Sequence, residues 1–208
     1  MVTTPTIPAI PTTPTTSVPA APAQSPIQTP EDVWAIFCGT ILEVTTQRLV
    51  DCLTTAMGRN AKHVHILFQS AGGTVGDGVF LYNMFRALPI PVTLYNAGQL
   101  SSAAVIAYLG AKGRKTSASG TFMIHRSTNS TQFATSSKLQ HLAKALVLDD
   151  ERTEAILRNH AAMPDELWTE LKYNDLYLSG EEAIKLGIAD GLGDFAPPPG
   201  TQVTNLLA

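Results

Sequence analysis

Short apolar runs alternate with helical stretches along the middle of this chain. Each run is rich in strand-forming residues and is followed by a segment whose apolar positions recur at helical spacing. Strands are expected at 33–39, 63–70, 91–98, 115–119 and 121–125, and helices over 45–57, from the glycines at 72–73 to Pro89, and after 101–102. Strands and helices in this order imply right-handed parallel crossovers, so the sequence predicts an α/β fold.

Two of the expected helices carry recognisable end signals. Thr45 is available as the N-cap of the first helix. Ser179 and Glu182, in the stretch SGEE, match a capping box, and this last short helix is expected to end at Gly187.

The longest helical stretch is expected from about Ser136 to Ala162. Its apolar residues follow one stripe at helical spacing: Leu139, Leu142, Ala143 and Leu146. A long helix with a single apolar stripe needs a surface to pack against, either on its own domain or on a partner.

The two ends of the chain differ in composition from the middle. Residues 1–30 contain eight Pro and eight Thr and no charged residue, which predicts a disordered tail. The prolines at 197–199 and the polar segment after them indicate a flexible C-terminal tail over 197–208. We therefore expect one folded domain over 31–196.

Composition and charge exclude several classes of protein. The chain has 208 residues, 44% of them hydrophobic and 15% charged, with a net charge of −3, as in ordinary soluble globular proteins. No basic cluster exceeds Lys112, Arg114 and Lys115, so nucleic-acid binding is not indicated. Because neither a membrane span nor a secretory signal is apparent, we expect a cytoplasmic protein.

The two cysteines also favour a cytoplasmic protein. Cys38 and Cys52 lie in apolar surroundings with no CxxC pattern and no His-rich neighbour. We expect buried free thiols in a reducing compartment rather than a disulfide or a metal site.

The stretch GQLSSAAVIAYLGA places Ser101 and Ser102 directly before an apolar helix. Taken alone, such a serine is most often an N-cap whose oxygen accepts a first-turn N–H. In a parallel α/β sheet, however, the glycines at 72–73 and the start of this helix should share one edge, where ligands gather. Exposed amides there, together with the N–H of Ala103, would suit an oxyanion site for acyl transfer. Ser102 is therefore a candidate nucleophile.

A serine hydroxyl attacks only when a base takes its proton. His125 ends a strand that should lie beside the Ser102 helix, so it is the candidate base. The alternative is a histidine with a purely structural role at a strand end. The other histidines lie at the wrong edge or on the long helix: His63, His65, His141 and His160.

The imidazole in turn needs a carboxylate to fix its tautomer and stabilise its cation. Asp175 stands alone before a short strand-like piece, where the chain returns to the sheet. The alternative is an ordinary turn residue. Four other aspartates are less suited because they lie on the long helix, near a helix start or in a terminal turn: Asp149, Asp150, Asp165 and Asp190.

The segments that carry these candidates resemble the signature regions of the Clp protease proteolytic subunit (ClpP) family of serine peptidases. They are 69–92, 95–127 and 175–192, and the likeness covers roughly 33–195. The resemblance implies a ClpP/crotonase-like spiral of βαβ units with a protruding long-helix handle. It implies Ser102, His125 and Asp175 as the catalytic triad. The family's Ser-Pro-Gly-Gly turn matches residues 70–73, which makes the N–H of Gly73 an oxyanion donor together with that of Ala103.

The resemblance also implies an assembly. In this family the long helix interdigitates with its counterpart from an opposed ring, and stacked rings enclose the active sites. A homo-oligomer acting on peptides or unfolded proteins is therefore implied, without a metal or other cofactor. The chain has no G-x-x-x-x-G-K-[ST] loop, so any ATP requirement would belong to a partner unfoldase.

The chain departs from the family pattern in four places. Ala71 replaces the usual proline, and Arg126 and Ser127 replace the usual Gln-Pro after the histidine. Ser101 adds a second hydroxyl beside Ser102, so it stays open as an alternative nucleophile. The uncharged tail does not resemble the family's axial loop, which contacts the unfoldase, so an AAA+ unfoldase partner also stays open.

Two other functions remain as alternatives. A crotonase-type acyl-CoA enzyme shares the same spiral core and a two-amide oxyanion hole, but does not require Ser, His and Asp together. A non-catalytic ring subunit would keep the fold and lose the activity. The complete set of candidate residues favours the serine endopeptidase.

Overall fold

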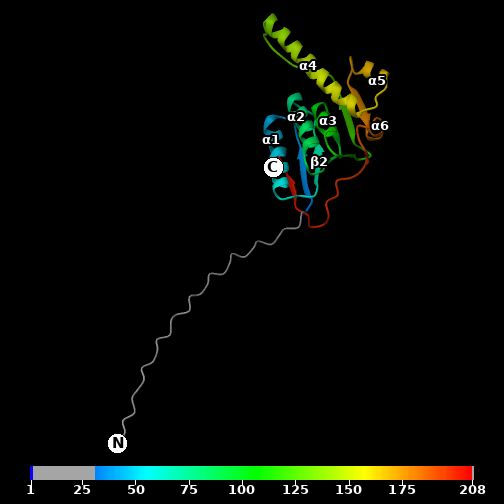
Figure 1. Ribbon diagram of the computed structural model, residues 1–208. Coiled ribbons are helices and arrows are strands. Elements are labelled where there is room, and N and C mark those ends of the chain that lie inside the picture. Colours follow the sequence, from blue (N-terminus) through cyan, green and yellow to red (C-terminus); the bar gives the residue numbers. More distant parts are fainter. Residues whose placement is uncertain (2–30, 208) are drawn as a thin grey trace.

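A parallel six-stranded sheet and a smaller three-stranded sheet form the centre of the molecule (Figure 1). The computed structural model describes Met1 and residues 31–207. The strands are β1 (Val33–Cys38), β2 (Val64–Gln69), β3 (Val92–Asn96), β4 (Gln99–Ser101), β5 (Gly113–Thr116), β6 (Thr121–Ile124), β7 (Leu176–Ser179), β8 (Gly191–Leu192) and β9 (Val203–Asn205). The helices are α1 (Glu43–Gly58), α2 (Val75–Ala87), α3 (Ala103–Leu109), α4 (Ser136–His160), α5 (Asp165–Glu170) and α6 (Gly180–Lys185).

The larger sheet confirms the expected α/β fold with parallel strands. Its order is β8-β5-β3-β2-β1-β9, and every neighbouring pair is parallel. In β2, Val64, Ile66 and Phe68 are fully buried, while the residues between them are half-buried. One face of the sheet therefore packs into the core and the other is partly open.

The smaller sheet, in the order β4-β6-β7, extends the structure beyond the end of β2. Strand β4 runs parallel to β6, and β6 runs antiparallel to β7. A bridge between Ser70 and Leu100 joins this sheet to the end of β2. The link brings the β2–α2 turn and the start of α3 to the same edge.

Helix α3 is the buried helix of the molecule, since all seven of its residues are buried. It packs closely on α2 at Gly78, where an added Cβ would lie 2.7 Å from the carbonyl oxygen of Ala103. Any larger residue at Gly78 would push the two helices apart. This close approach fixes where α3 begins.

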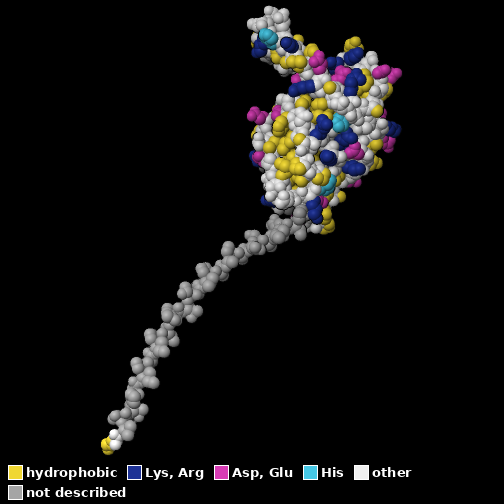
Figure 2. All heavy atoms as spheres, viewed as in Figure 1, with side chains coloured by type: hydrophobic (Ala, Val, Ile, Leu, Met, Phe, Trp, Pro, Cys, Tyr) yellow, Lys and Arg dark blue, Asp and Glu magenta, His cyan; other side chains and the backbone are white. Residues whose placement is uncertain are grey.

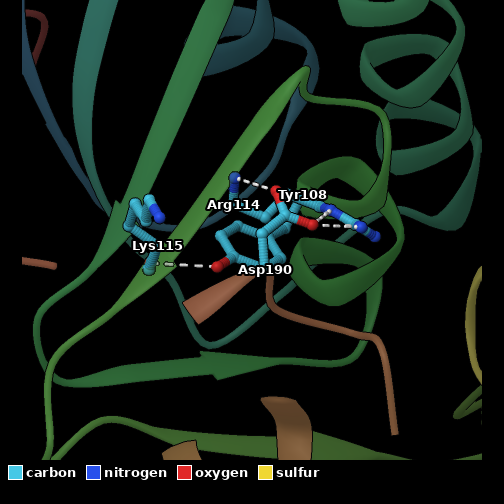
Figure 3. A network of polar contacts seen from close by, with 4 residues as sticks. All are labelled: Tyr108, Arg114, Lys115 and Asp190. Carbon is cyan, nitrogen blue, oxygen red and sulfur yellow. Dashed lines mark hydrogen bonds and ion pairs between the residues drawn. The ribbon is translucent and has the colours of Figure 1, made fainter. Parts of the chain in front are cut away.

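A polar network holds α3, β5 and the approach to β8 together (Figure 3). The Asp190 carboxylate accepts the Arg114 backbone N–H at 2.8 Å and the Arg114 Nε–H at 3.1 Å. The Tyr108 hydroxyl donates to the carbonyl of Lys115 at 2.9 Å. Burial raises the pKa of Tyr108, so the phenol stays protonated and keeps donating. Asp190 thus has a structural role, in agreement with its exclusion from the candidate site.

Helix α4 leaves the body of the protein and projects from it (Figure 1). Of its 25 residues only Ile156 and Leu157, near its C-terminal end, are buried. Leu139, Val147 and Leu148 are each at least half exposed, and hydrophobic side chains follow the projecting part in Figure 2. Of the expected apolar stripe, Leu139 and Ala143 are exposed and Leu142 and Leu146 are half-buried, so none of the four is fully covered in the described structure.

The end signals were predicted correctly for one of the two helices. Ser179 and Glu182 form the expected capping box before α6, and these hydrogen bonds lower the pKa of Glu182. Thr45 is not the N-cap of α1. The helix starts two residues earlier, after Leu42, and the Thr45 hydroxyl accepts the Leu42 N–H from inside the first turn.

The C-terminal segment differs from the flexible tail expected over 197–208. Strand β9 pairs with β1 at the edge of the larger sheet, and the Leu206 N–H donates to the carbonyl of Ile36 at 2.9 Å. The composition of 197–208 does not predict a strand there. The strand forms because the open edge of β1 offers hydrogen-bond partners to this segment. The expected disordered tail over 1–30, apart from Met1, lies outside the described residues and stays a prediction.

Both cysteines are free, but Cys38 is exposed rather than buried. It is the last residue of β1, where the strand leaves the core. Cys52 is half-buried on α1, and burial raises the pKa of its thiol.

Stacked rings cover the partly open face of the larger sheet. The ring of His65 lies between those of Trp34 and His63, with centroids 4.1 and 4.2 Å away. His65 Nδ1 is 2.9 Å from the Tyr95 hydroxyl, and His63 Nε2 is 2.8 Å from the Thr93 hydroxyl. These two histidines therefore have a packing role at the start of β2.

Acidification is expected to destabilise the fold through this stack. Desolvation lowers the pKa of His63 and of His65 below 6.5. The unfolded chain then binds protons more readily, so the stability is full above about pH 6.5 and is lost as the pH falls toward the depressed values. We expect a lower Tm at about pH 5.5 than at about pH 7.5 by calorimetry. The double variant His63→Gln, His65→Gln should flatten this dependence, and an unchanged slope would contradict it.

Candidate active site

Ser102 occupies a strained turn between β4 and α3. Its φ of 57° and ψ of −128° are unusual for a residue other than Gly. Although it precedes the helix, its side chain accepts no capping hydrogen bond. Ser102 thus occupies the N-cap position of α3 but does not cap the helix with its side chain, so its hydroxyl is left for another partner. Strained strand-to-helix turns also present the nucleophilic serine of α/β-hydrolases.

That partner is His125. The parallel register of β4 with β6 sets Ser101 beside Met123, and the Ser102 N–H donates to the carbonyl of Met123 at 2.8 Å. Two residues further along, His125 Nε2 lies 2.8 Å from Ser102 Oγ. An imidazole nitrogen at this distance can accept the serine proton, which is the arrangement that activates a hydroxyl.

Ser101 points elsewhere. Its side chain is almost fully buried, with 1% of the residue exposed. Its oxygen accepts a hydrogen bond from Gln99 Nε2 at 2.7 Å. Of the two neighbouring serines, Ser102 is the one beside the imidazole.

The glycine turn after β2 lies against Ser102. Gly72 has a φ of 93°, and a Cβ added there would lie 2.7 Å from Ser102 Cβ and 3.3 Å from the nitrogen of Ala103. Only glycine allows this approach. The Gly72 N–H donates to Ser70 Oγ at 3.1 Å. Within the described residues, no acceptor is found for the N–H of Gly73 or of Ala103.

Asp175 stands beside His125 in the strand register but makes no bond to it. Ile124 pairs with Leu176 at the end of the β6–β7 ladder, so the next residues, His125 and Asp175, follow on opposite strands. Asp175 is exposed. Within residues 31–207, neither a hydrogen bond nor an ion pair joins its carboxylate to the imidazole. The structure thus brings two of the three expected side chains into contact.

A different aspartate holds the segment that follows His125. Asp150, on α4, accepts the Arg126 Nε–H at 2.8 Å and the Ser127 backbone N–H at 2.7 Å. Sequence reasoning set this residue aside because it lies on the long helix. The one available signal was the pair Arg126-Ser127, which departs from the family pattern directly after the histidine.

The remaining histidines lie outside this site, as expected. His63 and His65 belong to the ring stack, and His160 Nε2 lies 3.0 Å from the hydroxyl of Tyr82. Burial lowers the pKa of His160. In the part of the chain that the structure describes, no cluster of three or more His, Cys, Asp or Glu side chains is suited to a metal ion.

Comparisons with known proteins agree with this fold. A family model described as Clp protease matches residues 32–194. A solved structure of a ClpP1 point mutant from Listeria monocytogenes is similar, with a TM-score of 0.68 and 20% sequence identity. The match covers 79% of this chain and 91% of that one. At this identity the structural likeness bears on the fold alone.

Proposed function

The chain belongs to the Clp protease family, and on this premise we propose that it is a serine endopeptidase with Ser102 as nucleophile and His125 as general base. The observation that carries the proposal is the distance of 2.8 Å between His125 Nε2 and Ser102 Oγ. The strained turn that presents the hydroxyl supports it further.

The proposed reaction is an acyl transfer in two stages. Ser102 Oγ attacks the peptide carbonyl carbon while His125 Nε2 takes the hydroxyl proton. His125 then gives that proton to the departing amine, which leaves an acyl group on Ser102. Water then attacks the acyl carbon while His125 Nε2 takes its proton; the bond from that carbon to Ser102 Oγ breaks, and the imidazole returns the proton to Oγ. Apart from the substrate and this water, the proposed steps use only groups of this chain.

The N–H groups of Gly73 and Ala103 are the proposed donors to the oxyanion. Both are free of acceptors among the described residues, and the glycine turn lies against Ser102. Donors fixed in advance stabilise the charge that develops on the carbonyl oxygen without further reorganisation.

Asp175 is the proposed carboxylate partner of His125. Its position opposite His125 at the end of the β6–β7 ladder supports this role. Among the described residues, no hydrogen bond joins this exposed carboxylate to the imidazole, so the proposed role requires the loop before β7 to bring it to His125 Nδ1 during catalysis.

We also propose that the protein acts as a homo-oligomer on peptides or unfolded proteins. The exposed apolar side chains of α4, Leu139, Val147 and Leu148, support an assembly that covers this helix. An ATP-driven unfoldase is a further partner that this proposal allows. The free thiols of Cys38 and Cys52 fit a reducing compartment such as the cytoplasm. None of the helices within residues 31–207 has both the length and the apolar character needed to cross a membrane.

Two substrate assays on the full-length chain test the proposed reaction class. We expect the protein to hydrolyse a fluorogenic peptide, and a fluorophosphonate to abolish this activity in proportion to the serine labelled. An acyl-CoA thioester should not be turned over. Thioester turnover that survives fluorophosphonate treatment would support the crotonase-type alternative, and a chain that neither cleaves peptide nor reacts would be a non-catalytic subunit.

A further inference from the structure

We propose that Asp150 is a positioning residue for this hydrolysis, because its carboxylate on α4 holds the segment after His125 and so keeps the imidazole on Ser102. The inference rests on the proposed function. It assigns to the projecting helix a direct effect on the reacting pair, in addition to any part in assembly.

Both oxygens of the Asp150 carboxylate are used. Oδ2 accepts the Arg126 Nε–H and Oδ1 accepts the Ser127 N–H, at 2.8 and 2.7 Å. The Asp150 side chain is 13% exposed, against 40% for Arg126. A mostly buried carboxylate that bonds a guanidinium and a main-chain N–H together makes a stronger contact than an exposed surface ion pair.

The segment that Asp150 holds has few other anchors. Strand β6 ends at Ile124, and the chain from 125 to 135 has no regular secondary structure. Within the described residues, no hydrogen bond is found for residues 128–134. The two bonds to Asp150 therefore fix the main chain immediately after His125, and with it the position of the imidazole.

Asp150 lies between the part of α4 that packs on the body of the protein and the part that projects from it. Toward the C-terminus of the helix, Ile156 and Leu157 are buried in the core, whereas the residues toward the N-terminus project from the body. A shift of the projecting part would move Asp150, and Arg126 and Ser127 with it. The position of α4 is thereby coupled to the hydrogen bond between His125 and Ser102.

The neighbouring residue provides a matched control. Asp149 pairs with Arg152 on the same helix, at 2.7 Å, and is not bonded to the segment after His125. Its removal takes an equal charge from the same turn of α4. A general effect on the helix or its assembly would therefore appear equally in Asp149→Ala and Asp150→Ala.

The test measures peptide hydrolysis and fluorophosphonate labelling in the full-length protein, with the oligomeric state and Tm recorded for each variant. We expect Asp150→Ala to lower kcat by about 10- to 100-fold, the scale of an effect of a misplaced catalytic group, with KM within about twofold. Asp150→Asn keeps an acceptor for the Ser127 N–H and should recover part of this loss. Asp149→Ala should keep kcat within about twofold of the parent, because no hydrogen bond or ion pair is found between Asp149 and the segment after His125 within the described residues.

Three results would overturn the inference. The first is an equal kcat for Asp150→Ala and the parent, and the second is an equal loss of kcat in Asp149→Ala and Asp150→Ala. The third is a rise in KM without a fall in kcat in Asp150→Ala, which would mean a role in substrate binding alone. If Asp150→Ala fails to fold, the comparison is made with Asp150→Asn and Arg126→Gln, and parent-like kcat in both would overturn it. Fluorophosphonate labelling of the parent protein distinguishes a failure of the Asp150 inference from a failure of the proposed function. If Ser102 of the parent is labelled, only the role of Asp150 is at stake, whereas an unlabelled parent would overturn both the role and the proposed function.

Discussion

Ser102→Ala is expected to lower kcat for peptide hydrolysis by about four orders of magnitude or more, whereas Ser101→Ala should keep it within a few-fold. Removing the nucleophile of a serine hydrolase leaves only the contribution of the oxyanion donors and of substrate binding. Ser102 is the serine beside His125 Nε2, at 2.8 Å, and it stands in the strained turn.

Ser101 is a suitable control because it differs from Ser102 in surroundings and not in chemistry. It is buried, and its oxygen accepts a hydrogen bond from the exposed Gln99, which can bond water once the serine is gone. The measurement is the initial rate of fluorogenic peptide cleavage by protein of matched oligomeric state. Full activity in Ser102→Ala, or its loss in Ser101→Ala with the fold intact, would show that the nucleophile is misassigned.

His125→Gln is expected to lower kcat by about three to four orders of magnitude and to slow fluorophosphonate labelling of Ser102 to a similar degree. Without the imidazole, the Ser102 hydroxyl has no base and stays protonated at neutral pH. Glutamine keeps a polar side chain at the end of β6, so the fold and the assembly should be retained. The kinetics of labelling, followed by mass spectrometry, isolate this step from product release.

Asp175→Asn extends the same measurement to the third proposed residue. If the carboxylate reaches His125 Nδ1 during catalysis, the variant should lose a large part of the activity, because an amide favours the wrong tautomer of the imidazole. Parent-like kcat would instead mean that Ser102 and His125 act as a pair, as they stand in this structure. In that case Asp175 would be the turn residue that its exposed position also allows.

The fold class and the location of the site follow from short-range signals. Alternating strands and helices determine a parallel sheet, and in such a sheet the glycines at 72–73 and the start of α3 must share an edge. The proximity of His125 to Ser102 is expected because the strand at 121–125 is predicted to lie beside the helix that Ser102 precedes, although β5 comes between α3 and β6 in the chain. The roles of these residues in catalysis remain predictions that the variants above test.

The features that sequence reasoning missed depend on contacts between distant parts of the chain. Strand β4 has only three residues and exists because it bridges β2 and β6. Strand β9 forms because β1 offers a free edge. The strained backbone of Ser102 lies between the glycine turn and the end of β6. The hydrogen bond from Arg126 to Asp150 joins residues 24 positions apart. Local composition carries none of this information.

The central claim is that Ser102 and His125 form an activated pair beside the main-chain N–H groups of Gly73 and Ala103. A crystal structure of the protein after reaction with a fluorophosphonate tests it most directly. We expect a covalent bond from phosphorus to Ser102 Oγ, with a phosphoryl oxygen about 3 Å from both nitrogens and the imidazole beside the adduct. An adduct on Ser101 or on any other side chain, or a phosphoryl oxygen turned away from both N–H groups, would contradict the account.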